Sequence, residues 1–221
     1  MDLSLAAQLN SVLAALILLA SFGLLVQRRI NGLLHIFAWQ GLFLSMSTAV
    51  VGYSAGLSHL YISAILTLIL KVFALPYILY TLIHRLKIHK EVEYMVNIPA
   101  TMLIGIALVI FSYHLTSPIM ELSTLVTRST LAVALSTVML GLLMMITRRK
   151  AVTQIVGFLS LENGLFFAAT SATYGMPLVV ELGVALDILI AAFIFGIFFF
   201  QIRTTFDSLD LKEMEKLKED E

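Results

Sequence analysis

The sequence predicts an all-α integral membrane protein with seven transmembrane helices, an outside N-terminus and a cytoplasmic C-terminus. Hydrophobic residues make up 60% of the 221 positions, charged residues make up 13%, and the mean hydropathy is +0.98. Soluble domains are about half apolar and about one quarter charged, so this composition indicates a membrane protein. The chain has no cysteine, which excludes disulfides, thiol catalysis and cysteine-ligated iron–sulfur clusters within it.

Seven apolar segments are long enough to cross a bilayer, because about 20 residues of helix span its hydrocarbon core. Asn97 and Pro99 are typical of a helix start, and Pro118 is expected in a loop. Gly175 and Pro177 divide the last two segments. The predicted spans are Ser4–Val26, Ile30–Tyr53, Leu57–Ile83, Ile98–Leu115, Leu122–Ile146, Ala151–Tyr174 and Pro177–Ile202.

The distribution of basic residues predicts the orientation of these spans. Twelve of the 14 Lys and Arg residues follow the first, third, fifth and seventh spans, and the loops on the other side have none. Basic loops stay in the cytoplasm, so the N-terminus is expected outside and the C-terminus inside. The twelve are Arg28, Arg29, Arg85, Lys87, Lys90, Arg148, Arg149, Lys150, Arg203, Lys212, Lys216 and Lys218.

Residues 1–205 form the predicted membrane domain, and residues 206–221 form a charged cytoplasmic tail. Within the tail, Glu213 precedes Lys216 by three residues and Glu215 precedes Lys218 by three. This spacing suits ion pairs along a solvated helix. A soluble terminal segment and a docking helix for a cytoplasmic partner both fit the pattern.

Three carboxylates lie within the last two predicted spans, where one charge at mid-bilayer costs about 2.5–3.5 kcal/mol on insertion scales. Glu162 and Asp187 lie near the middle of their spans, and Asn163 follows Glu162. Burial disfavours the charged form of a carboxyl group, so both acids are predicted proton carriers. Glu181 lies nearer the outer interface, where it either joins such a pathway or reaches water.

Two cations also lie inside predicted spans. Lys71 is near the middle of the third span, and Pro76 cannot donate to the Val72 carbonyl, which predicts a kink beside the lysine. Lys71 fits either a proton relay or a fixed salt bridge, and an ion pair with Lys71 is the structural alternative for Glu162. Arg128 lies roughly 9 Å deep in the fifth span. Its side chain can snorkel to the surface, which favours a structural role.

The second span adds two polar residues, His35 and Gln40, with Trp39 between them. In the sequence, no histidine pair or histidine–carboxylate cluster has the spacing of a metal site. Nucleotide-binding fingerprints and nucleophile motifs are also missing from it. We therefore predict no catalytic, cofactor-binding or metal-binding residue. The predicted supporting polar residues are Asn163, His35, Gln40 and Arg128.

One stretch, GFLSLENGLFF (residues 157–167), carries a resemblance to a known family. With its length and seven-span plan, the chain resembles component E of the hydrogenase-4 and formate hydrogenlyase type of membrane-bound nickel–iron hydrogenases. Residues 122–205 are also similar to the three-span K-type subunit of complex I and the C-type subunit of Mrp antiporters. Those subunits have a basic loop, a glycine, an acid and an asparagine in their second helix region, and another acid in their third helix.

The residues that match this K-type pattern are Arg148, Arg149, Lys150, Gly157, Glu162, Asn163 and Asp187. One departure concerns the first acid, whose usual position is occupied here by Leu159. Glu162 stands three residues further on, so its carboxylate lies nearly one turn away on roughly the same face.

The resemblance implies a non-catalytic subunit in the membrane arm of a complex I-related, energy-converting complex in a prokaryotic cytoplasmic membrane. The expected partners are antiporter-like membrane subunits and hydrogenase or related redox subunits, which would hold the nickel–iron centre and the iron–sulfur clusters. No cofactor is expected in this chain and no nucleic acid among its partners. Glu162, Asp187, Lys71 and Glu181 would belong to a proton-translocation pathway. A subunit of a cation/proton antiporter and a structural spacer of the membrane arm are open alternatives.

An internal repeat is also predicted. QGLFLS (Gln40–Ser45) is similar to NGLFFA (Asn163–Ala168), and both follow a double arginine. Spans one to three run in the same direction as spans five to seven. A parallel duplication of a three-helix unit would produce this pattern and would place Gln40 at the position of Asn163.

Overall fold

The computed structural model describes residues 3–85, 95–122, 130–173, 189 and 196, and its elements in these ranges are all helices. Within these described residues, six helices are long and apolar enough to cross a membrane, which confirms the all-α membrane class. The predicted seventh span and the tail lie outside the described residues, apart from Leu189 and Gly196. The helices are α1 (Leu3–Val26), α2 (Ile30–Ala55), α3 (Ser58–Thr67), a π-helical turn η1 (Leu68–Ala74), α4 (Leu75–Arg85), α5 (Ile98–Leu122), α6 (Thr130–Thr147) and α7 (Ala151–Thr173).

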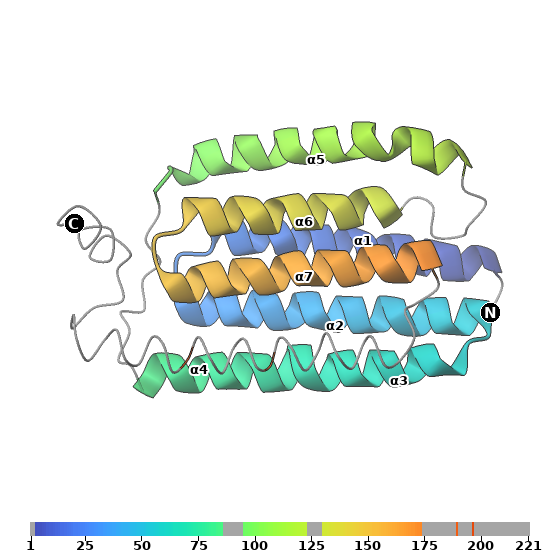
Figure 1. Cartoon of the computed structure of the whole chain (residues 1–221), viewed down its shortest axis with the longest axis horizontal. Helices are drawn as coiled ribbons and strands as arrows, with labels where there is room; N and C mark the ends of the chain where they lie inside the picture. Colours follow the sequence, from blue (N-terminus) through green and yellow to red (C-terminus); the bar gives the residue numbers. More distant parts are fainter. Residues whose placement is uncertain (1–2, 86–94, 123–129, 174–188, 190–195, 197–221) are drawn as a thin grey trace, which may run out of the picture.

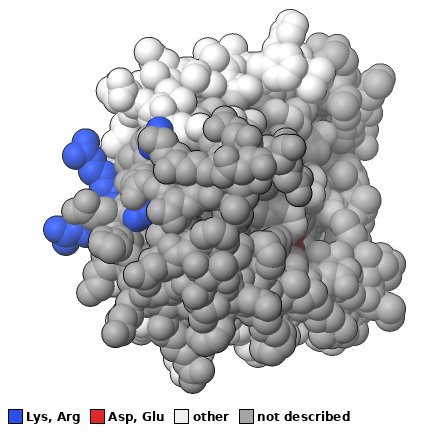
Figure 2. Space-filling view, turned by 60° about the vertical axis from the view of Figure 1, so that its left-hand side comes forward, with Lys and Arg blue, Asp and Glu red and all other residues white. Residues whose placement is uncertain are grey.

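The helices form a bundle whose members run side by side along its length (Figure 1). Helix α5 lies at one edge, and α3, η1 and α4 lie at the opposite edge, with α1, α2, α6 and α7 between them. Lys and Arg side chains gather at one end of the molecule (Figure 2). That end contains the α1–α2 and α6–α7 connections, as the predicted topology requires, whereas the side of the membrane that it faces stays a prediction.

Helices α6 and α7 pack backbone to backbone through two glycines. A Cβ atom on Gly141 would lie 2.7 Å from the backbone nitrogen of Leu161, and one on Gly164 would lie 2.8 Å from that of Val138. Small residues allow membrane helices to approach this closely. The tight contact brackets Glu162 and leaves that turn of α7 little freedom to rotate.

A short turn folds α3, η1 and α4 back along α2. Gly56 ends α2 with φ 67° and ψ 25°, a left-handed conformation that glycine adopts without steric cost. The N–H of Leu57 then donates to the carbonyl of Gly52 over 3.1 Å and closes the helix end. The third span is thereby held against the second, which places Lys71 beside α2.

The predicted start of the fourth span is confirmed, but its predicted end is wrong. Helix α5 begins at Ile98, with Pro99 in its first turn, as the cap pattern predicts. It then continues through Pro118 to Leu122, where a loop was expected. A proline removes one helical hydrogen bond, and membrane helices tolerate this loss near an end. Leu122, the predicted start of the fifth span, is thus the last residue of α5, and α6 is described from Thr130.

Candidate functional site

The π-helical turn η1 brings Lys71 into the interior of the bundle. Pro76 has no N–H group, so the Val72 carbonyl loses its α-helical donor. The helix widens just before the proline, and the Leu75 N–H donates to the Leu70 carbonyl, five residues back. Lys71 lies within this turn and is only 5% exposed. The predicted opening of the helix beside Lys71 therefore takes the form of a π turn.

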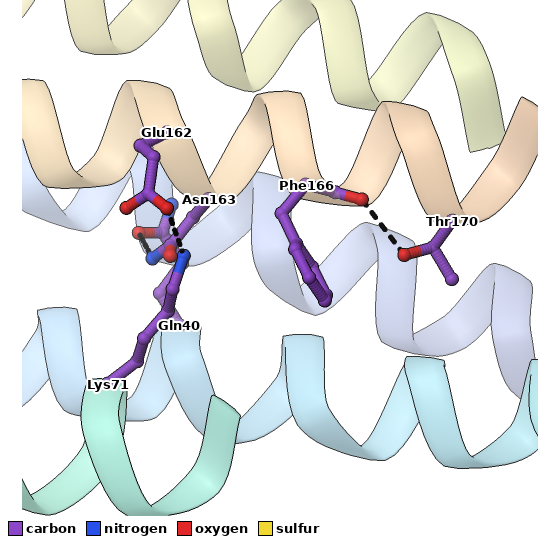
Figure 3. Close-up of polar contacts among 6 residues, drawn as sticks. All are labelled: Gln40, Lys71, Glu162, Asn163, Phe166 and Thr170. Carbon is purple, nitrogen blue, oxygen red and sulfur yellow. Dashed lines mark hydrogen bonds and ion pairs between the residues drawn. The ribbon is translucent and has the colours of Figure 1, made fainter. Parts of the chain in front are cut away.

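Lys71 forms an ion pair with Glu162 of α7 (Figure 3). The Lys71 Nζ atom lies 3.0 Å from Glu162 Oε1 and 5.4 Å from the centre of the Phe166 ring. Glu162 is 8% exposed, and its Oε2 atom has no hydrogen-bond partner among the described residues. The Lys71–Glu162 ion pair, which the sequence offered as the structural alternative for Glu162, is therefore present. A fixed salt bridge and a proton relay would both involve these two side chains.

Gln40 of α2 joins three helices beside this ion pair. Its Nε2 atom donates to the hydroxyl oxygens of Ser21 on α1 and Ser160 on α7, which are 2.9 and 3.0 Å away. Its Oε1 atom accepts a 3.1 Å hydrogen bond from Nδ2 of Asn163, the residue after Glu162 (Figure 3). The two positions that the predicted repeat aligns, Gln40 and Asn163, thus contact each other. The duplication itself stays a prediction.

These buried polar side chains form one layer, here called the polar layer: Ser21, Gln40, Lys71, Ser160, Glu162 and Asn163. Along α1, α2 and α7, its members lie between two clusters of buried apolar residues. Buried polar residues, among them Ser45 and Thr67, also lie beyond the layer. Representatives of the cluster toward the basic end are Leu24, Phe37, Leu75 and Leu159. Representatives of the other cluster are Ile17, Leu44, Ala134 and Phe167.

The structure does not bring every predicted residue to this layer. His35 is exposed on α2, and its Nδ1 atom lies 2.7 Å from the Asn31 carbonyl oxygen in its own helix. Asp187, Glu181 and Arg128 lie outside the described residues. The predicted residues that the structure unites are Gln40, Lys71, Glu162 and Asn163.

Sequence reasoning missed four neighbours of the ion pair. Ser21 and Ser160 accept hydrogen bonds from Gln40, the Phe166 ring lies near the lysine ammonium, and Gly41 packs against the Lys71 backbone. Helical spacing was an available signal for two of them, because residues three or four apart share a face of a helix. Ser160 and Phe166 stand at such distances from Asn163 and Glu162. Ser21 and Gly41 carried no comparable signal.

Arg148 has a role that its place in a basic loop did not indicate. The side chain is 1% exposed, and its Nη2 atom donates to the carbonyl oxygens of Leu24 and Leu25, 2.9 and 2.6 Å away. These carbonyls belong to the last turn of α1, where a helix has unpaired acceptors and the negative end of its dipole. Arg148 therefore caps α1 from the loop between α6 and α7.

The chain shares sequence similarity with known proteins over different lengths. It is 33% identical over 88 residues to Hydrogenase-4 component E of Escherichia coli, which covers 40% of this chain and 41% of that protein. The same holds for Hydrogenase-4 component E of Shigella flexneri. The predicted resemblance is thus confirmed over part of the chain, and its extension to the whole chain stays a prediction. No family model and no solved structure matches the sequence.

A second relative covers nearly the full length. The chain is 30% identical over 204 residues to Uncharacterized protein Rv0085 of Mycobacterium tuberculosis. The match spans 92% of this chain and 93% of that protein. Together with six helices of membrane-spanning length, this defines a multi-pass membrane protein with a relative of the same size. The chain belongs to the same protein family as Rv0085 of Mycobacterium tuberculosis.

Proposed function

We propose that this protein is a membrane subunit of a hydrogenase-type, complex I-related complex, and that its polar layer carries protons. The partial similarity to Hydrogenase-4 component E supports membership of such a complex. The redox centres belong to partner subunits in this proposal. The chain itself contributes a mid-membrane site at which a proton is held and passed on.

The observation that carries the proposal is the buried contact between Lys71 Nζ and Glu162 Oε1 at 3.0 Å. An amine and a carboxyl at hydrogen-bond distance can exchange one proton without moving the helices. Glu162 Oε2 has no partner among the described residues, which leaves it available to accept or release a proton on its other side. Intramembrane ionisable residues of this kind commonly mark ion pathways.

The apolar residues that flank Glu162 along α7 support a lateral direction of transfer. Leu159 lies on one side of Glu162 along α7 and Phe167 lies on the other, both nearly fully buried. A proton that reaches the carboxyl group would therefore enter and leave in the plane of the membrane, through neighbouring subunits. Asp187 and Glu181 are the further members that we propose for this route.

Replacement of Glu162 by Gln tests the proposal. Glutamine keeps the size and a hydrogen-bond acceptor for Lys71 but cannot carry the proton, so proton translocation by the assembled complex should be lost. The complex should still assemble, as measured by co-purification of its subunits, and its redox activity should persist. Glu215→Gln, in the predicted solvated tail, is the matched control. Translocation at the wild-type rate by Glu162→Gln would contradict the proposal.

A structural spacer is the second candidate, and the same ion pair favours it. A fixed Lys71–Glu162 contact would simply tie η1 to α7. In that case Lys71→Met should destroy assembly of the complex, with any loss of translocation following from that. Intact assembly with altered translocation would instead favour the proton pathway.

A further inference from the structure

Two adjacent residues of α2, Gln40 and Gly41, contact the segments that carry the two halves of the ion pair. Successive residues of a helix point about 100° apart, so these two face different neighbours. Helix α2 packs against both α7 and η1. It therefore touches the element that carries Glu162 and the element that carries Lys71.

On the α7 side, Gln40 holds the turn that contains Glu162. Its amide bonds Ser160 through Nε2 and Asn163 through Oε1, over 3.0 and 3.1 Å. These two partners stand on either side of Glu162 in the sequence and three residues apart on the helix. Two bonds from one buried amide thus fix both the rotation and the depth of this turn.

On the η1 side, the absence of a side chain at Gly41 lets the backbone of Lys71 approach. A Cβ atom on Gly41 would lie 3.1 Å from the Lys71 Cβ and 3.3 Å from its carbonyl oxygen. Neither atom can rotate away, because both are fixed to the backbone, so η1 itself would have to shift. The carbonyl also lacks its usual donors, since the Leu75 N–H donates to Leu70 and Pro76 has no N–H. Gly41 is a close neighbour of this Lys71 carbonyl oxygen.

We propose that Gln40 and Gly41 are positioning residues that set the separation of the Lys71 ammonium group and the Glu162 carboxylate. Neither residue touches the proton in transfer. Gln40 fixes the carboxylate from α7, and Gly41 fixes the depth to which η1 sinks against α2. The effect on proton transfer rests on the proposed function, whereas the effect on geometry is measurable without it.

A carbodiimide of apolar character measures this geometry in the full-length protein in its membrane. The reagent activates a buried carboxyl group. A neighbouring amine then displaces the urea and forms an amide, so that the protein loses one water in total. Without an amine in contact, the activated carboxyl rearranges to a stable acylurea. Mass spectrometry of peptides containing Lys71 and Glu162 gives the ratio of amide to acylurea.

The expected wild-type result is an amide between Lys71 and Glu162. In Gln40→Met and in Gly41→Ala, the ratio of amide to acylurea should fall about tenfold, since displacement of reacting groups by less than 1 Å has effects of this size. The two variants act through different helices, so each tests the proposal if the other fails to fold.

Two controls match these variants. Ser47→Ala removes a buried α1–α2 hydrogen bond to Asn10, away from the ion pair. Gly23→Ala adds a methyl group that would meet only the Ile36 side chain, at an ordinary 3.4 Å. Both should keep the wild-type ratio. The proposal is overturned by an unchanged ratio in both Gln40→Met and Gly41→Ala, by an equal fall in the controls, or by no amide in the wild type.

A pH profile separates this inference from the proposed function. In the assembled complex, Gln40→Met and Gly41→Ala should move the pH of half-maximal proton translocation by about one unit, a tenfold change in proton affinity. If Glu162→Gln leaves translocation intact while the amide ratio still falls, the proposed function fails and the positioning role stands. If the ratio of amide to acylurea is normal in both positioning variants while Glu162→Gln loses translocation, the positioning role fails and the proposed function stands.

Discussion

Two buried cations lie in different regions of the molecule, and the protein satisfies each in a different way. Lys71 lies in the polar layer and pairs with the carboxylate of Glu162. Arg148 lies at the end of the bundle and donates to the carbonyl oxygens of Leu24 and Leu25. Both side chains are almost wholly removed from solvent. The carboxylate partner of Lys71 can gain a proton, whereas these two carbonyl partners of Arg148 cannot.

This difference in partner chemistry separates a fixed contact from an exchangeable one. Backbone carbonyls at the end of a helix stay acceptors at every pH, so these two contacts of Arg148 do not depend on protonation of the partner. The Lys71–Glu162 pair can become neutral when a proton moves from the ammonium group to the carboxylate. Burial alone therefore does not distinguish these two cations, whereas the chemistry of these partners does.

The largest expected effect on stability comes from Arg148→Met. The change removes two charge-assisted hydrogen bonds and leaves buried carbonyls without that donor, which should cost about 3–6 kcal/mol of unfolding free energy. Unfolding by SDS in mixed micelles measures the loss. Arg149→Met is the matched control, because it removes the same charge from a half-buried neighbour. Equal losses of unfolding free energy in the two variants would show that the positive charge of the loop, and not the cap on α1, stabilises the protein.

Lys71→Met should have a somewhat smaller effect on stability. The change leaves the buried Glu162 carboxylate without the ammonium group that pairs with it. Removing one partner of a buried ion pair costs about 3–5 kcal/mol of unfolding free energy. The same SDS unfolding assay measures this loss.

Two comparisons test this explanation of Lys71→Met. The double variant Lys71→Met/Glu162→Gln should recover most of the stability at pH 7, because it leaves no buried charge behind. Glu162→Gln alone should keep most of the stability, because glutamine can still accept a hydrogen bond from Lys71. A double variant that is as unstable as Lys71→Met would contradict this explanation.

The smallest expected effect comes from a neutral hydrogen bond to a carbonyl, which calibrates the charged contacts of Arg148. Ser45 donates to the Ala64 carbonyl over 2.7 Å and links α2 to α3. Ser45→Ala should cost about 0.6–1.7 kcal/mol, as interhelical hydrogen bonds in membranes do. In Ser112→Ala, the lost bond joins Ser112 to Leu108 within α5, so a smaller change is expected in the same SDS assay.

Hydropathy and helix breakers predicted most of the fold. The starts of α2, α5 and α7 agree with the predicted spans to the residue. Pro118 misled the prediction because α5 continues through it, so the loss of one hydrogen bond near the helix end does not stop this helix. The prediction that Arg148 lies in a loop after the fifth span is correct. An arginine in a loop looks the same in the sequence, however, whether its side chain is solvated or, like that of Arg148, buried in a helix cap.

The candidate site was predictable as residues but not as contacts. Glu162 and Lys71 stand out because charged residues are rare in apolar segments. Their pairing joins positions 91 residues apart, and nothing local in the sequence specifies it. The role of Gly41 depends on how closely η1 approaches α2, which is a property of packing that composition and periodicity do not encode.

The π turn Leu68–Ala74 has a consequence for how this protein tolerates changes in chain length. Such a turn accommodates about one residue more than an α turn of similar length. If one residue of this turn before Lys71 were deleted, the segment could form a regular α-helix. The lysine would then lie about 100° further around the helix axis. In relatives, the lysine and the extra residue should therefore be inherited or lost together.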